Sequence, residues 1–509
     1  MNKDIPKNII ILGGGSAGWM AASLIQKMWD KHNINIILVE SKNIGTIGVG
    51  EGSTPYMRDF FKILGISESQ WMPACHATYK CGISFPNWQS EKNSGYFHPF
   101  FSVLDIDSAQ AFFQNCGFKR KGKKVHTHPD DFFVSAELAR QNKAPIASQS
   151  LPFEPDYGYH FDAGLLAKFL KKYCLSKGLN HKIATIKTVG KDSAGNISSL
   201  VTNDNEELVA DFFVDCTGFA SVLISKNLGV EFESFSDNLF NDSAIAIPTA
   251  IEKEATIASY TESTALKNGW AWKIPLTSRI GNGYVYSSKF CTDEEAEQEF
   301  RDHLGEQSQG VESRLIKLKV GKIKKHWHKN CLAVGLSQGF IEPLEATALM
   351  LVQITIMKFM ETFEKEGSYE LGQEQYNQEI DKYFDGVRDY IVAHYQLNNR
   401  TDTDYWCANR NHSNVSKTFK DLINTWEQGG DFEACLTKHN DNIVYLRPSW
   451  YCMFAGMNRF PDKLVKPTKN KKITAHKTVK KYCQDAAQIF PDHQTYLKKL
   501  YLDNWSKVN

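Results

Sequence analysis

The hydrophobic pattern at the start of the chain predicts a strand, a tight turn, a helix and a second strand. The apolar run NIIIL leads into the glycines of GGGSAG, and apolar residues then recur at helical spacing through MAASLIQKM. A second apolar run, INIILVE, ends at Glu40. This order is typical of the parallel α/β sheets that bind dinucleotides.

Further along the chain, alternating side chains predict an antiparallel hairpin. In GWAWKIPL, strand alternation places Trp270, Trp272 and Ile274 on one face and Pro275 on the other. The Asn282–Gly283 pair that follows is a strong signal for the hairpin turn. The plain interpretation is that both indoles fill the core of a sheet.

Three further patterns complete the predicted architecture. Residues 208–218 and 331–340 are apolar enough to form continuous buried strands, and the second leads into a long helix from Leu344. Helical periodicity dominates after Tyr369. No internal repeat or long linker is visible, so we expect the lobes to be interleaved in sequence.

Composition and charge narrow the class of protein without naming a chemistry. The chain has 509 residues, of which 42% are hydrophobic, and a formal net charge of +1, which favours neither nucleic acid nor a membrane as partner. The basic runs 119–124 and 463–481 lack interleaved aromatic residues, so solvated surface is the simpler explanation for both. The 11 cysteines include no CxxC pair and the N-terminus has no signal-peptide pattern; both indicate a cytoplasmic protein.

The first candidate site is the glycine turn. Gly13, Gly15 and Gly18 follow the GxGxxG spacing, and Glu40 ends the next strand 22 positions after Gly18. The glycines permit a tight turn, close approach of a pyrophosphate and close helix packing, while the carboxylate would accept hydrogen bonds from a ribose. The motif leaves FAD and NAD open. The second glycine-rich stretch, 45–55, suits either a ligand or a flexible loop.

Two ionisable residues stand in unusual settings. Lys80 lies among aromatic and apolar residues in YKCGISFPNW; a surface lysine is the default, but a buried one would favour the neutral, nucleophilic amine. In GFIEPLEATALML, Pro343 suits a first helical turn. The amides of Thr347 and Ala348 would then be ready to bind an anion beside Glu345. The alternative is a carboxylate that interacts with its own helix dipole.

Together these motifs resemble the flavin-dependent tryptophan halogenases over most of the chain. The matching segments, in the family's order, are GGGSAGWM, GVGEGSTP, YKCGISFPNW, GWAWKIPLTSRIGNGYVYSS, GLSQGFIEPLEAT and SWYCMFAGM. The resemblance implies an enzyme that uses reduced FAD, O2 and chloride or bromide to make hypohalous acid, which is relayed to a lysine and halogenates an electron-rich ring. A separate flavin reductase is expected, since no second GxGxxG is present for a nicotinamide cofactor.

The resemblance also assigns roles to matching positions. Lys80 would be the active-site lysine, Glu345 the catalytic glutamate, and the amides of Thr347 and Ala348 the halide site, although the family has glycine at the last position. No metal is expected. The other assignments are FAD binding for Gly13, Gly15, Ser16, Ala17, Gly18, Glu40, Gly50 and Leu336; the substrate pocket for His98, Phe100 and Trp450; and the flavin-side signature, thought to disfavour hydroxylation, for Trp270, Trp272, Ile274 and Pro275.

The match with the family weakens at the substrate. Residues 415–452 lack the family's clasp for the tryptophan backbone, so we expect a small, free-standing, indole-like aromatic faced by Tyr445 and Trp450. A flavin monooxygenase that hydroxylates an aromatic ring is the main alternative. A non-catalytic flavin-binding protein is a third, against which the joint presence of Lys80, Glu345 and the paired tryptophans argues.

The predicted fold is α/β, with a Rossmann-like FAD-binding lobe of the flavin monooxygenase type, a sheet-rich substrate lobe and a helical C-terminal region. A homo-oligomer is compatible with the sequence. The expected segments are 1–95, 161–230 and 326–395 for the FAD-binding lobe, the last with the halide site; 96–160 and 231–325 for the substrate lobe; and 396–509 for a helical cap.

Overall fold

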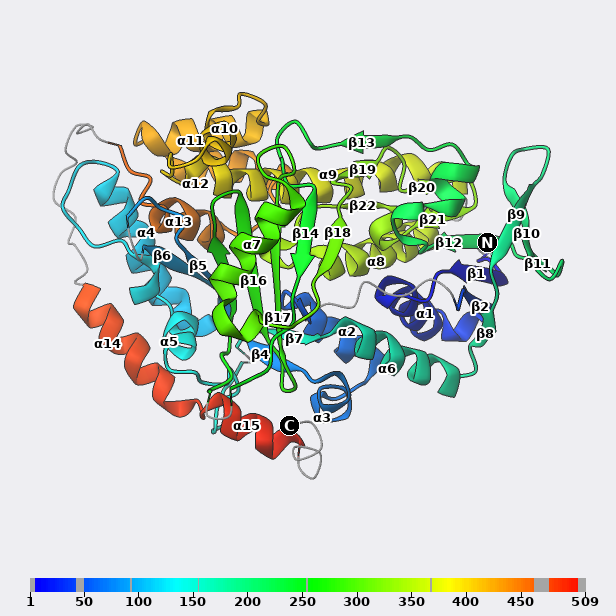
Figure 1. Cartoon of the computed structure of the whole chain (residues 1–509), viewed down its shortest axis with the longest axis horizontal. Helices are drawn as coiled ribbons and strands as arrows, with labels where there is room; N and C mark the ends of the chain where they lie inside the picture. The colour runs from blue at the N-terminus through cyan, green and yellow to red at the C-terminus, as the bar shows by residue number, and fades with distance from the viewer. Residues whose placement is uncertain are drawn as a thin grey trace.

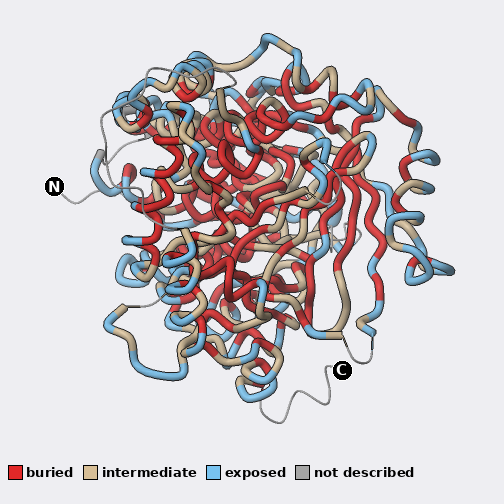
Figure 2. The backbone as a smooth tube through the Cα atoms, turned by 90° about the vertical axis from the view of Figure 1, so that its left-hand side faces the viewer, coloured by how far each residue is buried: buried red, intermediate tan, exposed pale blue. Residues whose placement is uncertain are grey.

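The computed structural model is built around two large sheets with helices packed between and outside them (Figure 1). It describes residues 5–42, 50–91, 94–153, 155–252, 255–366, 369–461 and 476–501. The buried positions run through the interior of both sheets and the helices between them (Figure 2). Within these ranges no helix is long and apolar enough to cross a bilayer.

The first sheet contains the predicted strand–turn–helix–strand unit. Its six strands lie in the order β20–β21–β12–β1–β2–β8, and β1 pairs in parallel with both β2 and β12. In β1, Ile9 and Ile11 join one core cluster and Ile10 and Leu12 another, as expected for a parallel strand covered on both faces. The bounds are β1 (Asn8–Leu12), β2 (Asn35–Glu40), β8 (Asn180–Ile183), β12 (Phe212–Asp215), β20 (Trp327–His328) and β21 (Cys331–Ala333), with α1 (Ser16–Met28) and α6 (Ala163–Ser176) packed together beside it.

The second sheet contains the two tryptophans. Its seven strands lie in the order β18–β14–β17–β16–β15–β5–β6 and are antiparallel except between β15 and β5. The predicted alternation is confirmed, because Trp270, Trp272 and Ile274 join one core cluster whereas Ala271 joins another. The bounds are β5 (Gly82–Pro86), β6 (Gly95–Pro99), β14 (Ser243–Ala246), β15 (Thr261–Ala265), β16 (Gly269–Pro275), β17 (Ile280–Tyr286) and β18 (Arg314–Lys317), with α7 (Asp293–Leu304) beside it.

The predicted turn at Asn282–Gly283 is wrong. The chain reverses earlier, where the amide of Leu276 donates to the carbonyl of Arg279, and both Asn282 and Gly283 lie inside β17. A Cβ at Gly283 would lie 2.0 Å from the Trp272 ring. Glycine is therefore present to leave room for the indole, not to turn the chain.

Two predicted continuous strands are also wrong. Residues 208–218 divide into β11 (Glu207–Val209) and β12, which belong to different sheets. Residues 331–340 divide into β21, a 3₁₀ turn at Gly335–Ser337, and β22 (Gly339–Phe340). The sequence did not reveal these breaks, because the pieces pair with different strands and yet are all apolar.

A small three-stranded sheet packs against β16 and β17 of the second large sheet. It has the order β3–β7–β4 and consists of β3 (Gly50–Gly52), β7 (Gly158–Asp162) and β4 (Thr78–Lys80). The other strands are β9 (Ile186–Lys191), β10 (Ile197–Thr202), β13 (Phe232–Ser234) and β19 (Gly321–Ile323). The small sheet carries Lys80, the lysine singled out in the sequence, at the end of β4.

Helices dominate after Tyr369, as predicted. α8 (Ala348–Glu366) packs on α1, and α14 and α15 run along one edge of the molecule near α4 and α5 (Figure 1). The bounds are α2 (Tyr56–Leu64), α3 (Glu68–Trp71), α4 (Ile106–Lys119), α5 (Val134–Arg140), α9 (Tyr369–Leu397), α10 (Asp404–Asn411), α11 (Lys417–Glu427), α12 (Phe432–Lys438), α13 (Arg447–Gly456), α14 (His476–Ala486) and α15 (His493–Tyr501).

Two sequence predictions fall partly outside the described residues. These are the glycine-rich stretch up to residue 49 and the second basic run up to residue 475. In the first basic run, Lys119 donates to Thr127 and Asn458, so that lysine packs against the protein rather than standing free.

Candidate active site

The glycine turn between β1 and α1 has the geometry of an anion cradle. Gly13 has φ +120°, and a Cβ there would lie 2.2 Å from the carbonyl oxygen of Cys216. A Cβ at Gly18 would lie 1.9 Å from the carbonyl oxygen of Gly13. Gly15 begins α1 with no capping side chain, so the first amides of the helix are open to an anionic group.

Glu40 lies beside this turn, as predicted. A Cβ at Gly14 would lie 1.6 Å from Oε2 of Glu40, so the carboxylate stands directly over the glycines. Its Oε1 accepts from Lys171 at 2.7 Å and His181 at 2.8 Å. The sequence did not reveal these two partners, which orient the carboxylate and leave Oε2 as its side toward the turn.

The remaining residues predicted to bind the cofactor gather at the same place. The Cβ of Ala17 lies 2.7 Å from where a Cβ of Gly335 would be, so the turn containing Leu336 lies against the start of α1. Ser16 donates its hydroxyl to the carbonyl of Ala163 at 3.2 Å. Segments more than 300 residues apart thus form one edge of the cleft.

Lys80 is fully buried, which answers the question that its sequence setting left open. Its side chain has no exposed surface, and Nζ has no hydrogen-bond partner among the described residues. Nζ lies 5.4 Å from the centre of the Phe100 ring. Burial lowers the pKa of Lys80 to about 7, against the opposing influence of the Glu345 charge.

Lys80 and the Glu345 segment flank a common point. A Cβ at Gly52 would lie 3.3 Å from Nζ of Lys80, 3.3 Å from Oγ1 of Thr261 and 3.7 Å from Cβ of Ala346. Glu345 immediately precedes Ala346. The Lys80 amine and the segment that carries Glu345, 265 positions apart in the chain, therefore meet at this point, here called the chamber beside Gly52, and the Glu345 charge is close enough to act on the amine.

Glu345 lies between two buried histidines. Its Oε2 is 3.1 Å from Nδ1 of His98, and its Oε1 is 2.9 Å from Nε2 of His394. Burial by itself would raise the pKa of Glu345, but the two histidines outweigh it and lower the pKa to about 2. His98, predicted to line the substrate pocket, thus contacts the carboxylate directly.

The predicted helix start at Pro343 is wrong. Pro343–Glu345 form a short 3₁₀ turn, Ala346 takes a left-handed conformation with φ 56°, and α8 begins only at Ala348. A left-handed alanine costs about 1–2 kcal/mol. That strained residue turns Glu345 away from the helix start and toward the histidines, while Thr347 accepts from Leu351 in the first turn of α8.

An aromatic chamber adjoins Glu345 and has unusual polar content. Tyr390 lies at its centre, with ring-centre distances of 3.6 Å to Tyr445, 4.9 Å to Trp450 and 6.1 Å to His98. Several buried polar atoms there have no hydrogen-bond partner among the described residues: Nζ of Lys80, the hydroxyls of Tyr96 and Tyr390, Nε2 of His98 and Nε1 of Trp450. Buried polar groups are nearly always paired, so this cluster marks a place for a ligand or ordered water.

The sequence missed three residues of this chamber, Tyr96, Tyr390 and His394. None lies in a recognisable motif, and two belong to the long helix α9, whose periodicity indicates only a packed face. Tyr96 precedes His98 on the same face of β6, a proximity that could have indicated it.

Strand β16, which carries the predicted signature Trp270–Pro275, packs against the small sheet that contains Lys80. Cγ2 of Ile274 lies 3.4 Å from where a Cβ of Gly50 would be, at one end of β3, while Gly52 at the other end faces Lys80. The carbonyl of Pro275 accepts from the hydroxyl of Thr78, two residues before Lys80, at 2.7 Å. A single short strand thus spans from the signature residues to the amine.

Trp270 leads to a second buried glutamate. Its Nε1 donates to Oε2 of Glu342 at 2.8 Å, and the same oxygen accepts from Asn241 at 2.8 Å and from Tyr395 at 2.6 Å. Burial raises the pKa of Glu342 despite these hydrogen bonds. Trp270 is therefore fixed by a polar contact and not only by packing.

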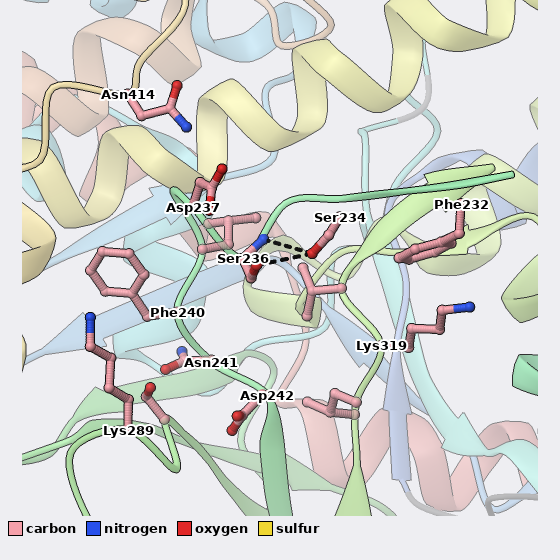
Figure 3. A pocket seen from close by; sticks show the side chains of 14 residues that line it. Phe232, Ser234, Ser236, Asp237, Phe240, Asn241, Asp242, Lys289, Lys319 and Asn414 are labelled. Carbon is pink, nitrogen blue, oxygen red and sulfur yellow. Dashed lines mark hydrogen bonds between the residues drawn. The ribbon is translucent and has the colours of Figure 1, made fainter. Parts of the chain in front are cut away.

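A separate surface cleft of about 720 Å³ lies on the far side of Asn241 (Figure 3). Phe240, Asn241 and Lys289 are among its lining residues, and none of the predicted site residues is. Asn241 therefore joins the wall of this cleft to Glu342, but the cleft is distinct from the chamber that contains Lys80 and Glu345.

Both the sequence and the fold are similar to those of known proteins. Residues 8–472 match the family model described as tryptophan halogenase. The chain is 36% identical to tryptophan 6-halogenase SttH of Streptomyces toxytricini over 84% of this chain and 85% of that one, and 34% identical to tryptophan 7-halogenase RebH of Lentzea aerocolonigenes over 89% and 90%. The crystal structure of SttH superposes with a TM-score of 0.85 over 97% of this chain and 99% of that one. Xcc4156, a flavin-dependent halogenase from Xanthomonas campestris, gives 0.86 at 29% identity over 97% and 98%.

Proposed function

The chain belongs to the tryptophan halogenase family, whose members are flavin-dependent enzymes, and we propose that Lys80 and Glu345 carry its halogenation of an electron-rich aromatic ring. The observation that supports these roles is the approach, beside Gly52, of the buried Lys80 amine and Ala346, which directly follows the buried Glu345. The Glu345 charge acts on the amine there. Burying an amine and a carboxyl group is costly, so packing of the core alone does not explain why both are present.

The glycine cradle fits the pyrophosphate and ribose of FAD. A side chain at Gly13, Gly14 or Gly18 would collide with the backbone or with Glu40, so the turn is kept free of side chains where a dinucleotide backbone would lie. Bound reduced FAD would supply, together with O2, the oxidising equivalents that convert a halide to hypohalous acid. The residues that would hold it are Gly13, Gly15, Ser16, Ala17, Gly18, Glu40, Gly50 and Leu336.

The halide would bind at the start of α8. The amide of Ala348 begins the first turn of a 19-residue helix and the amide of Thr347 directly precedes it, at the end where unpaired amides and the helix dipole favour an anion. The Cβ of Ala348 narrows this site relative to glycine, so the halide preference is expected to differ from that of relatives with glycine there.

Lys80 would meet the oxidised halogen. A pKa of about 7 keeps much of the amine neutral near neutral pH, and a neutral amine has the lone pair needed to bind hypohalous acid or to form an N–halogen bond. Burial excludes water and other nucleophiles that would consume the oxidant. β3, with Gly50 beside Ile274 and Gly52 beside Lys80, would lie along the route from the flavin to the amine.

Glu345 would receive the ring proton. After the ring takes the halogen, the C–H electron pair returns to the ring and the proton passes to a carboxylate oxygen. A positioned base of this kind contributes roughly 10²–10⁴-fold. The low pKa of Glu345 does not prevent this step, because a protonated, halogenated ring is a strong acid and the carboxylate charge stabilises it.

The substrate we propose is a free-standing, indole-like aromatic rather than free tryptophan. The chamber around Tyr390 offers ring faces for stacking together with the orphaned hydroxyls and the Trp450 N–H. Within residues 415–452 no clasp for an amino acid backbone is recognisable in sequence. A separate flavin reductase is proposed to supply reduced FAD. The lobes are proposed to follow the segment boundaries given above.

The test is a product assay. The protein is incubated with FAD, a flavin reductase, O2, bromide or chloride, and a panel that includes indole, substituted indoles and L-tryptophan. We expect a product whose mass carries the bromine or chlorine isotope pattern with at least one indole. Addition of one oxygen without halogen would favour the monooxygenase alternative, and efficient, regioselective turnover of L-tryptophan would contradict the proposed substrate class.

A further inference from the structure

His394, which no motif indicated, has an unusual set of contacts behind Glu345. Its side chain has no exposed surface. Nδ1 lies 2.9 Å from the carbonyl oxygen of Tyr390, one turn earlier in α9, and Nε2 lies 2.9 Å from Oε1 of Glu345. The contact with Glu345 has ion-pair distance but not hydrogen-bond geometry, and neither Nε2 of His394 nor Oε1 of Glu345 has a hydrogen-bond partner among the described residues.

These contacts determine where the protons are. A carbonyl oxygen only accepts, so Nδ1 of His394 must carry a proton. A neutral ring would then present the Nε2 lone pair to the carboxylate oxygen of Glu345 at 2.9 Å, which is repulsive. A second proton is therefore required between the two residues, either on the imidazole or on the carboxyl group.

The surroundings favour the imidazole. Glu345 contacts His394 directly, the buried carboxyl group of Glu342 lies near enough to interact with it, and the phenol ring of Tyr390 packs against it. The rings of Phe85 and Trp88 cover other sides, with centres 5.0 and 5.8 Å away. A cation at His394 thus has the Glu345 carboxylate as its contacting counter-charge.

Glu345 has the complementary surroundings. His98 contacts its other oxygen at 3.1 Å, and the Lys80 amine lies across the chamber. A carboxylate surrounded by imidazole and amine groups is stabilised in its charged form. The surroundings therefore favour both the protonated imidazole of His394 and the ionised carboxylate of Glu345.

We propose that His394 is a positioning residue, held as an imidazolium in the resting enzyme, that keeps Glu345 ionised and its free edge directed at the ring proton. The catalytic consequence rests on the function proposed above. When Glu345 takes the ring proton, the adjacent imidazolium disfavours the neutral acid, so the proton is released to solvent and the carboxylate is restored for the next turnover. No electron transfer is involved.

The protonation state is tested without catalysis, by ¹⁵N NMR of histidine-labelled apoprotein. The His394 resonances are identified by comparison with Glu345→Gln, an isosteric variant whose fold is checked by its thermal transition. Both nitrogens of His394 are expected to be protonated at pH 7 in the wild-type protein, and Nε2 to lose its proton in Glu345→Gln. A deprotonated Nε2 in the wild-type protein at pH 7 would overturn the proposal, whether or not the protein halogenates.

A kinetic test separates charge from packing. In His394→Gln, the amide can still donate to Glu345 but carries no charge, so halogenation kcat is expected to fall at least tenfold while KM and the oxidation of reduced FAD change less than twofold. His326→Gln is the matched control. It removes another buried histidine–carboxylate contact, 3.1 Å from Asp381, at a site about 20 Å away along α9. Equal kcat in His394→Gln and wild type would overturn the proposal.

Discussion

Glu342 and Glu345 are three residues apart and both almost fully buried, and yet their pKa values are shifted in opposite directions. Their exposed fractions are 0% and 3%. Burial dominates at Glu342 and raises its pKa, whereas at Glu345 two histidines lower the pKa to about 2. Because residue type and burial are the same, the difference comes from the partners.

The hydrogen-bond partners also indicate a structural role for Glu342 and a chemical role for Glu345. Glu342 accepts from an indole, an amide and a phenol, all neutral donors that bind one oxygen and fix Trp270. Glu345 instead faces imidazoles and, across the chamber, an amine. Neutral donors hold a carboxylate in place without ensuring that it is charged, whereas basic partners keep it ready to accept a proton.

The largest expected effect is on catalysis at Glu345. Glu345→Gln keeps the shape of the side chain but removes the base, so halogenation kcat should fall by roughly 10²–10⁴-fold with reduced-FAD oxidation retained. Glu342→Gln is the matched variant and should lower kcat by no more than about tenfold. Similar losses in both variants, measured by product formation at saturating substrate, would break the contrast between the two residues.

For stability, we expect the larger effect at Glu342 and the smaller effect at Glu345. Glu342→Leu removes the acceptor of three hydrogen bonds and leaves the donors on Trp270, Asn241 and Tyr395 buried without it, which should lower the free energy of unfolding by about 1–3 kcal/mol. Urea titration at pH 7 measures it. An unchanged midpoint, with the same slope, would show that the three hydrogen bonds do not stabilise the fold.

The pH dependence of halogenation should follow Lys80. Burial depresses the pKa of its amine to about 7, so the neutral form grows, and kcat should rise, by about tenfold between pH 6 and pH 8. The Glu345 charge raises the pKa of Lys80 against the effect of burial. In Glu345→Gln, the rise of the residual kcat with pH should therefore occur at a lower pH. In Glu342→Gln, kcat should rise over the same pH range as in the wild-type enzyme. A kcat of the wild-type enzyme that does not change with pH would contradict the role of the amine.

A smaller effect is expected at Trp270. Trp270→Phe keeps an aromatic ring on the strand but removes the N–H that donates to Glu342, so the protein should lose about 1 kcal/mol of stability. Trp272→Phe is the comparison, because the Trp272 Nε1 has no hydrogen-bond partner among the described residues. Equal thermal shifts in the two variants would mean that packing, not the contact with Glu342, explains the loss.

The sequence predicted what local patterns encode. The glycine turn, Glu40 at the strand end and the alternation through Trp270 and Trp272 follow from spacing alone, and the structure has them as expected. The family assignment, carried by the motifs, was also confirmed. These features depend on a few consecutive residues, so no tertiary contact was needed to find them.

What the sequence could not predict depends on partners distant in the chain. The left-handed Ala346 breaks the expected helix because tertiary packing directs Glu345 toward His98 and His394, about 250 and 50 residues away. Gly283 lies in a strand because an indole from the neighbouring strand needs its space. The burial of Lys80 likewise depends on neighbours that its own segment does not reveal.

The central claim is that the buried amine beside Gly52 delivers the halogen to the ring. Lys80→Met tests it most directly, since methionine fills a similar volume in an apolar site without an amine. With reduced FAD, O2, bromide and an accepted indole, the variant should oxidise reduced FAD at the wild-type rate and form no detectable brominated product. Bromination at a rate near that of the wild-type enzyme would contradict the account.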